Sequence, residues 1–196
     1  MTTADGSVIG TTQIFGGAPR NRGFNVVLLA EGFTAAQQGD FDNACAAFLT
    51  AFTGTPPFDD LAPAINVFRV NVSSTDSGAD DPASAGGTGA VVNTYFDATF
   101  CVGGTKQRAV GGNVELVQDT VEAWIPEWHQ ILVLVDGPQR GGAAGSIGWF
   151  STGGNDWRET AIHELGHSAF GLADEYDYDG PDVWEDGEPS QPNVST

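Results

Sequence analysis

The sequence predicts an α/β fold, in which a layered, mostly parallel sheet is flanked by helices. Two short runs of β-forming residues, 24–30 and 131–135, are apolar on both faces, which is typical of strands buried inside a parallel sheet. Helical patterns separate the strands, and the resulting order β-α-β-α-β favours one layered domain. The chain of 196 residues contains no linker or internal repeat, so we expect a single domain over residues 1–196.

The first elements follow from local signals. Residues 1–23 are rich in glycine and threonine and predict a leading loop or a weak edge strand. After the buried strand 24–30, Thr34 and Gln37 have the spacing of a capping box. The next residues predict an amphipathic helix, which two consecutive prolines end. Its apolar face consists of Phe41, Ala44, Cys45, Phe48 and Phe52.

The middle of the chain supplies a second strand and a second helix. Residues 65–72 alternate between apolar and polar side chains, as a strand does. Residues 73–93 are rich in Ser, Asp, Gly and Ala and predict a long surface loop. Asn113 is placed to cap a helix that ends near Trp124. We expect one face of this helix to carry Val114, Val117 and Val121.

Charge limits the partners of the protein. There are 26 Asp and Glu against 7 Lys and Arg, a formal charge of −19. Such a surface repels nucleic acid and anionic membranes, so we expect neither as a partner, while it attracts cations and favours solubility. No apolar run approaches ~18 residues, and no signal peptide is visible at the start. Cys45 and Cys101 are too few for a disulfide framework, and pairing or two free thiols both remain open.

Two histidines point to a metal site. A glycine-dense segment, 137–154, predicts an irregular edge strand or loop that leads into a helix starting near Asn155 or Asp156. On this helix His163 and His167 are four residues apart, so both imidazoles face one side and can reach a single ion. The opposite side, which should pack on the sheet, carries Ile162, Leu165 and Ala169.

Glu164 gives this pair a catalytic pattern, H-E-x-x-H. It follows the first histidine by about 100° around the helix, and can therefore contact a water molecule at the metal without ligating the metal. Zinc lowers the pKa of such a water to about 7, and a neighbouring carboxylate can accept its proton. The pattern predicts Zn²⁺ as cofactor and Glu164 as general base.

A third ligand is expected after the helix. Gly171 can adopt a positive φ and turn the chain back toward the metal. The polar residue three positions further, Asp174, is the best candidate, and Glu175 is the alternative. His129 precedes a strand far upstream and is expected to be a surface residue.

Other signals near the site are weaker. Tyr176 is a candidate to donate a hydrogen bond to a developing oxyanion, or else it packs beneath an acidic loop; Tyr178 is a poorer candidate. The acids of 177–182 miss the spacing of a calcium loop, so we expect a solvated acidic loop. Residues 145–151 predict either a cleft rim that binds substrate backbone as an added strand or a simple connector.

The string His163-Glu-Leu-Gly-His-Ser-Ala-Phe-Gly-Leu-Ala-Asp-Glu-Tyr176 closely resembles the signature of the IgA-specific metallo-endopeptidase family. The segments 25–33, 68–72, 77–82 and 193–196 are similar as well, so the resemblance covers nearly the whole chain. It implies a bacterial, exported zinc endopeptidase, extracellular or periplasmic. It also implies that His163 and His167 are ligands, that Glu164 is the base, and that a further ligand lies within 174–175.

The chain departs from this family at its end. Members usually continue with cysteines and a methionine near the site, so we expect a chain truncated at the C-terminus. The one methionine is Met1, so no methionine turn lies under the metal.

Three functions compete at this point. The leading hypothesis is a zincin-like, zinc-dependent endopeptidase that hydrolyses peptide bonds with Glu164 as base. It would act as a monomer on protein or peptide substrates. The alternatives are a zinc amide hydrolase acting on cell-wall peptide crosslinks, and a secreted binding module with a vestigial zinc site. A structural site would need no base at Glu164 and would favour a fourth protein ligand.

Overall fold

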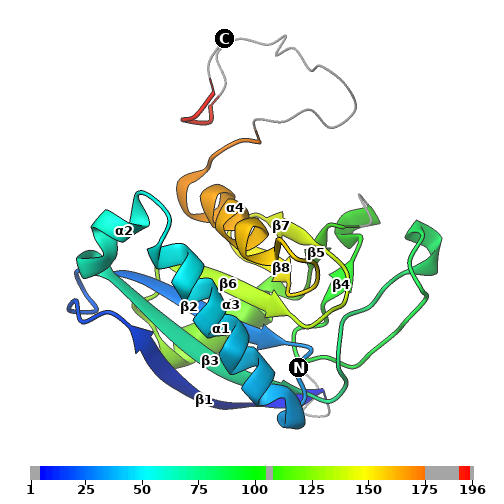
Figure 1. The fold of residues 1–196 in the computed structure, drawn as a ribbon. Coiled ribbons are helices and arrows are strands. Elements are labelled where there is room, and N and C mark those ends of the chain that lie inside the picture. The colour runs from blue at the N-terminus through cyan, green and yellow to red at the C-terminus, as the bar shows by residue number, and fades with distance from the viewer. Residues whose placement is uncertain (1–4, 105–107, 175–189, 195–196) are drawn as a thin grey trace.

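A computed structural model describes residues 5–104, 108–174 and 190–194, which form an α/β fold around a six-stranded sheet (Figure 1). The strands of this sheet are β1 (Gly6–Phe15), β2 (Phe24–Glu31), β3 (Ile65–Ser74), β6 (Gln130–Val135), β7 (Gly142–Ala144) and β8 (Gly148–Ser151). Their spatial order is β1-β3-β2-β6-β8-β7. The three inner pairings are parallel, and the two outer pairings, β1 with β3 and β7 with β8, are antiparallel. A separate pair consists of β4 (Thr99–Phe100) and β5 (Val110–Gly111).

Helices cover both faces of the sheet. They are α1 (Gln38–Thr53), α2 (Phe58–Leu61), α3 (Val114–Trp124) and α4 (Trp157–Phe170), with 3₁₀ turns at Ala35–Gln37, Ala62–Ala64, Ala83–Ala85 and Val102–Gly104. Figure 1 shows α1 and α4 side by side on one face, with α3 on the other. The connection from β2 to β3 contains α1 and steps across the sheet in one direction, whereas the connection from β3 to β6 contains α3 and steps in the other direction. Right-handed crossovers in opposite directions place their helices on opposite faces of the sheet, as observed.

The predicted strands are confirmed, and their burial explains their composition. Every residue of β6 is buried, and β2 is buried from its second residue onward, because both strands lie in the middle of the sheet with a layer on each face. The segment 1–23 contains the edge strand β1. The segment 137–154 contains two strands, β7 and β8. Only β7 is the predicted edge strand, because β8 pairs on both sides and is fully buried.

The helix signals are also confirmed, with one error. Thr34 donates its backbone N–H to Gln37 Oε1 at 3.1 Å, and the turn that they begin runs into α1. The Asn113 side chain accepts the Leu116 N–H at 3.0 Å and caps α3. Val114 was expected on the apolar face but is 40% exposed. The buried stripe of α3 is centred nearer to Leu116 and Thr120, so Val114 falls at its margin in the first turn.

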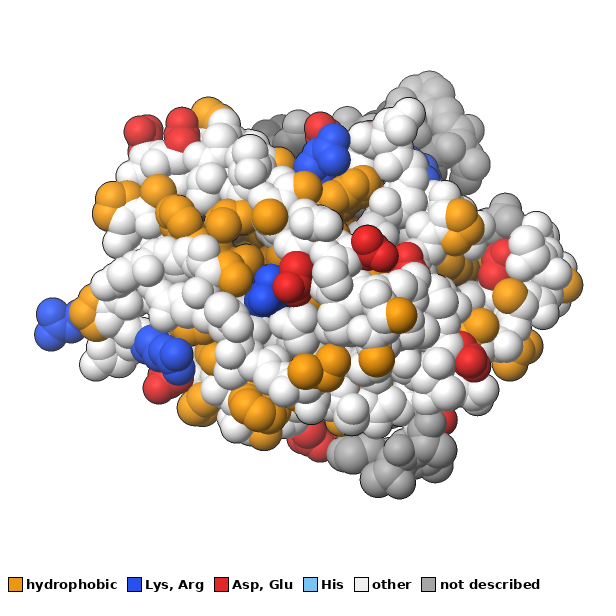
Figure 2. Space-filling model, turned by 60° about the horizontal axis from the view of Figure 1, so that its bottom comes forward, with side chains coloured by type: hydrophobic (Ala, Val, Ile, Leu, Met, Phe, Trp, Pro, Cys, Tyr) orange, Lys and Arg blue, Asp and Glu red, His pale blue; other side chains and the backbone are white. Residues whose placement is uncertain are grey.

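The predicted surface loop, 73–93, begins two residues too early, because β3 continues to Ser74. The rest of it contains one 3₁₀ turn and isolated β-bridges at Asp80 and Asp81, and Ala79 and Asp81 are buried. Cys45 and Cys101 are both buried free thiols. Among the described residues, no helix has the length and apolar character needed to cross a membrane. On the face in Figure 2, Lys and Arg side chains stand singly and form no basic patch.

Candidate metal centre

Helix α4 packs against the sheet on one side and carries the two histidines on the other. Leu165 is fully buried beneath it, while Ile162 and Ala169 pack partly buried against the core. Ser168 Oγ donates to the Glu164 carbonyl at 2.7 Å and accepts from the Gln130 side chain of β6 at 2.8 Å. These contacts hold the helix in one position along the sheet, as a precise site requires.

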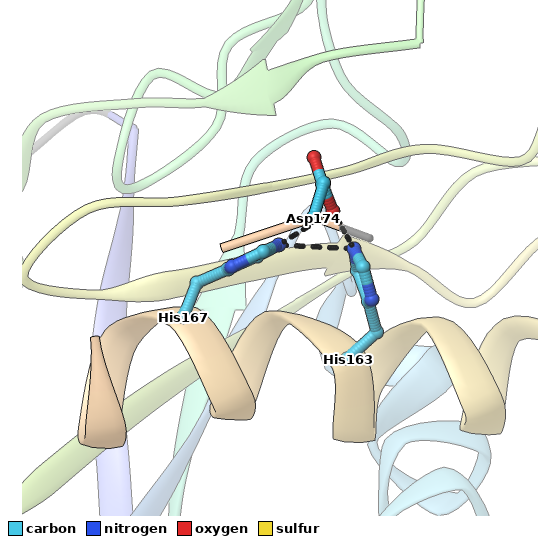
Figure 3. A group of neighbouring side chains, drawn as sticks. All are labelled: His163, His167 and Asp174. Atoms are coloured by element: carbon cyan, nitrogen blue, oxygen red, sulfur yellow. Dashed lines mark hydrogen bonds and ion pairs between the residues drawn. The ribbon is translucent and has the colours of Figure 1, made fainter. Parts of the chain in front are cut away.

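The two histidines and one aspartate converge above α4 (Figure 3). The Nε2 atoms of His163 and His167 lie 3.0 Å apart. Asp174 Oδ1 lies 3.0 Å from Nε2 of His163 and 3.1 Å from Nε2 of His167. Within the described ranges, this is the group of His, Cys, Asp and Glu side chains whose ligand atoms are close enough to hold a metal ion.

A glycine turn brings Asp174 to the histidines. Gly171 has φ 65° and ends α4 in the left-handed region, as its position after the helix predicted. Its N–H donates to the His167 carbonyl at 2.9 Å, and the Leu172 N–H donates to the Gly166 carbonyl at 3.3 Å. The chain therefore reverses within two residues and returns Asp174 toward the side chains of the last helical turns.

Hydrogen bonding and burial prepare the histidines for a metal. His167 Nδ1 lies 2.6 Å from the Leu172 carbonyl oxygen. Because a carbonyl can only accept, the neutral ring carries its proton on Nδ1 and offers a lone pair at Nε2. Burial, followed by the neighbouring His167, lowers the pKa of His163. The neutral imidazole that a metal needs is thereby favoured.

The spacing of the three atoms fits zinc. Ligand atoms around a tetrahedral zinc stand about 3.3 Å apart when the zinc–ligand distances are about 2.0–2.1 Å. The separations of 3.0–3.1 Å are close to this value. Two imidazole nitrogens and one carboxylate oxygen are also a donor set that zinc takes in catalytic sites, with a fourth position left open.

Glu164 lies beside this group and does not join it. Glu164 is only 6% exposed. Burial raises the pKa of its carboxyl to about 7, although the nearby His167 acts to lower this pKa. The strand β7 passes very close to it, since a Cβ built on Gly142 would lie 2.4 Å from Glu164 Oε1. Glu164 is thus a buried carboxyl whose pKa suits proton transfer near neutral pH.

These side chains open into a cavity of about 1200 Å³. Its lining combines α4, the turn after it, β7 and the segment before β5, with the residues Arg108, Ala109, Arg140, Gly141, Gly142, Ala143, Ala144, Glu159, Thr160, His163, Glu164, His167, Leu172, Ala173, Asp174 and Gln191. Of the two interpretations of 145–151, the cleft rim is wrong, because this segment contains the buried strand β8 and the cavity is bordered by β7 instead.

Comparison with protein-family models identifies the chain. The model of the family described as IgA Peptidase M64 matches residues 13–196. The chain belongs to the IgA peptidase M64 family. A search of curated proteins finds no match. The membership supports a metallopeptidase, whose substrates are proteins or peptides.

Of the other residues predicted for this M64 peptidase, His129 lies away from the metal centre and the rest lie outside the described residues. His129 is exposed and accepts the Asn25 N–H at 3.2 Å, as a surface residue outside the site. Glu175, Tyr176, Tyr178 and the acids of 177–182 lie outside the described residues. Sequence reasoning missed Gly142 and Arg108 at the site, because neither stands in a motif and their proximity depends on strand pairing.

Proposed function

We propose that this chain is a zinc-dependent endopeptidase of zincin-like architecture, with zinc held by His163, His167 and Asp174. The convergence of three ligand atoms at 3.0–3.1 Å beside a buried carboxyl carries this proposal. The family match supports the same reaction class.

Zinc, when bound, polarises a carbonyl and lowers the pKa of water. Glu164 is then the general base, since its carboxyl is buried next to the ligands and does not join them. Such a carboxylate accepts a proton from the attacking water and passes it to the leaving amine. A purely structural zinc site has no use for such a carboxyl, which favours the catalytic function over the binding-module alternative.

The substrate is proposed to lie along β7. This strand is the outermost of the sheet on that side, and Gly142, Ala143 and Ala144 all line the cavity. The Gly142 N–H already donates to the Arg108 carbonyl at 3.0 Å, so the part of this edge that we propose for the substrate lies beyond Gly142, toward Ala144. A sheet edge beside a cavity can accept an extended peptide as an added strand, with backbone hydrogen bonds that do not depend on side-chain identity. An extended protein segment is therefore the substrate class that this cavity suits.

The test measures zinc content and digestion of unfolded casein together. The wild type should hold one zinc ion and cleave casein, and a chelator should stop cleavage. His163→Ala should lose both properties, while His129→Ala, a change at an exposed histidine outside the site, should keep both. Full zinc in His163→Ala would contradict the ligand assignment. A wild type that holds one zinc ion and cleaves neither casein nor a peptide library would contradict the peptidase.

A further inference from the structure

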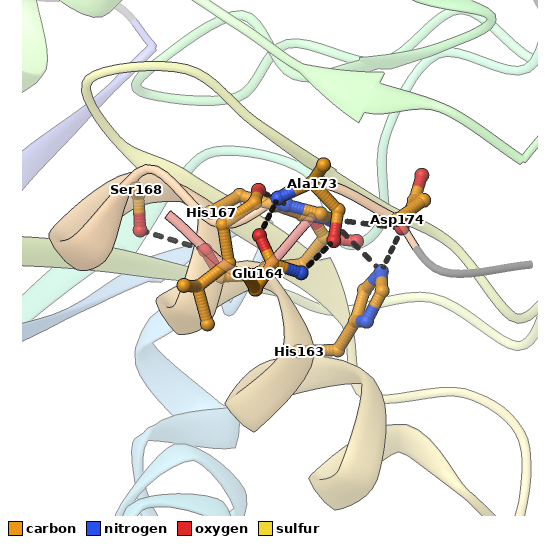
Figure 4. Close-up of polar contacts among 8 residues, drawn as sticks. His163, Glu164, His167, Ser168, Ala173 and Asp174 are labelled. Atoms are coloured by element: carbon orange, nitrogen blue, oxygen red, sulfur yellow. Dashed lines mark hydrogen bonds and ion pairs between the residues drawn. The ribbon is translucent and has the colours of Figure 1, made fainter. Parts of the chain in front are cut away.

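A side chain from the end of the chain holds the segment that carries the third ligand. Asn193 Oδ1 accepts the Ala173 N–H at 2.8 Å, and Asn193 Nδ2 donates to the Ala173 carbonyl at 2.9 Å. One amide group thus satisfies both backbone groups of one residue, as a neighbouring β-strand would. The contact joins positions 20 residues apart. Figure 4 shows Ala173 close to Asp174 and the two histidines.

Ala173 occupies a critical place in the site. The residue before it, Leu172, accepts the hydrogen bond that orients His167. The residue after it, Asp174, places Oδ1 between the two histidine Nε2 atoms. A shift of the Ala173 backbone would therefore displace one ligand directly and release the orientation of another.

The glycine turn alone does not fix this segment. Among the described residues, the backbone bonds from this turn to the end of α4 are those of Gly171 and Leu172. Ala173 and Asp174 have no regular secondary structure. The two bonds from Asn193 supply the restraint that a strand partner would otherwise give.

We propose that Asn193 is a positioning residue for the metal site, which acts through Ala173 to hold Asp174 in its ligating position. This inference rests on the proposed zinc site. It adds Asn193 to the residues that support that site, and Gln191, two positions before Asn193, also lines the cavity. Partners that orient metal ligands in this way typically change metal affinity by 10- to 100-fold.

The test compares zinc affinities of the full chain by competition with a chromophoric chelator. Asn193→Ala should weaken zinc binding by about 10- to 100-fold. Ser190→Ala removes an exposed side chain of the same segment and should bind zinc as the wild type does. The visible spectrum of the cobalt(II)-substituted protein should change in Asn193→Ala and not in Ser190→Ala, because it reports ligand geometry and not overall stability.

A double-mutant cycle separates positioning from general stability. If Asn193 acts through Asp174, Asn193→Ala should cost much less affinity in an Asp174→Ala background than in the wild type. An equal loss in both backgrounds, or wild-type affinity in Asn193→Ala, would overturn the inference. A wild type that binds no zinc would instead overturn the proposed function.

Circular dichroism checks that the variants fold. If Asn193→Ala does not fold, the isosteric Asn193→Asp replaces it, since this change keeps the acceptor of the Ala173 N–H, removes the donor to the Ala173 carbonyl and adds one negative charge. Its affinity is measured at about 0.5 M salt, which screens the added charge. Weaker zinc binding than in the wild type is again expected, and equal binding would overturn the inference.

Discussion

Gly142 lies where β7 passes the Glu164 carboxyl, and its replacement by alanine should reduce turnover while the metal stays bound. A Cβ at this position would lie 2.4 Å from Glu164 Oε1 and 2.8 Å from Thr160 Cγ2. No positive φ is needed at Gly142, so the alanine backbone itself is not strained. The conflict falls on the two side chains of α4.

The size of the effect follows from these distances. Oε1 must retreat by about 1 Å to reach the ordinary contact distance of 3.4 Å. A misplacement of about 1 Å in a reacting group can cost about 10²-fold in rate. Overpacking should lower the free energy of unfolding by about 1–3 kcal/mol. The three atoms nearest to the new methyl belong to Glu164 and Thr160 and not to the zinc ligands, so zinc affinity should change little.

The assay measures casein hydrolysis, zinc content and thermal unfolding for Gly142→Ala and Gly145→Ala. Gly145 belongs to the same hairpin, and a Cβ there meets nothing within 4 Å. Gly145→Ala should therefore resemble the wild type in all three measurements. Wild-type turnover in a zinc-loaded Gly142→Ala protein would refute the claim that the Glu164 position is tightly defined.

Three further predictions concern ligands, pH and capping. Asp174→Ala should weaken zinc affinity by at least ~10-fold and Glu175→Ala much less, and a chelator titration with the reverse ranking would assign the ligand to Glu175. In the metal-free protein, burial raises the pKa of Glu164 from 4.5 to about 7, so the folded state favours the protonated carboxyl. The free energy of unfolding should then fall as pH rises from about 4.5 through about 7. Glu164→Gln should remove up to about 3 kcal/mol of that fall in urea unfolding, and an unchanged pH dependence would contradict the raised pKa. Asn113→Ala should cost about 1 kcal/mol of stability without loss of zinc, because the Leu116 N–H loses its acceptor; equal stability would count against the cap.

Local patterns predicted much of the fold and the site. Apolar runs located β2 and β6 because strands buried on both faces must be apolar on both faces. The spacing of His163 and His167, followed by Gly171, was enough to predict that Asp174 lies near them, because helix geometry and a left-handed turn are properties of short segments.

Features that depend on long-range packing could not be predicted in this way. The proximity of Gly142 to Glu164 depends on the pairing of β7 with β8 and on the packing of α4 against both. The contact of Asn193 with Ala173 joins two irregular segments, and neither has a pattern that indicates its partner. The prediction that Val114 lies on the apolar face of α3 was wrong, because the buried face of a helix is set by the sheet beneath it and not by valine spacing alone.

The role of Glu164 is the most direct test of the proposed mechanism. Glu164→Gln keeps the size of the side chain and removes its capacity to accept a proton. The variant and the wild type are compared for peptide turnover at pH 7, with zinc content measured on the same samples. We predict one zinc ion in each protein and a loss of turnover of about 10²-fold or more in the variant. Turnover near the wild-type rate in a fully zinc-loaded Glu164→Gln protein would contradict the mechanism.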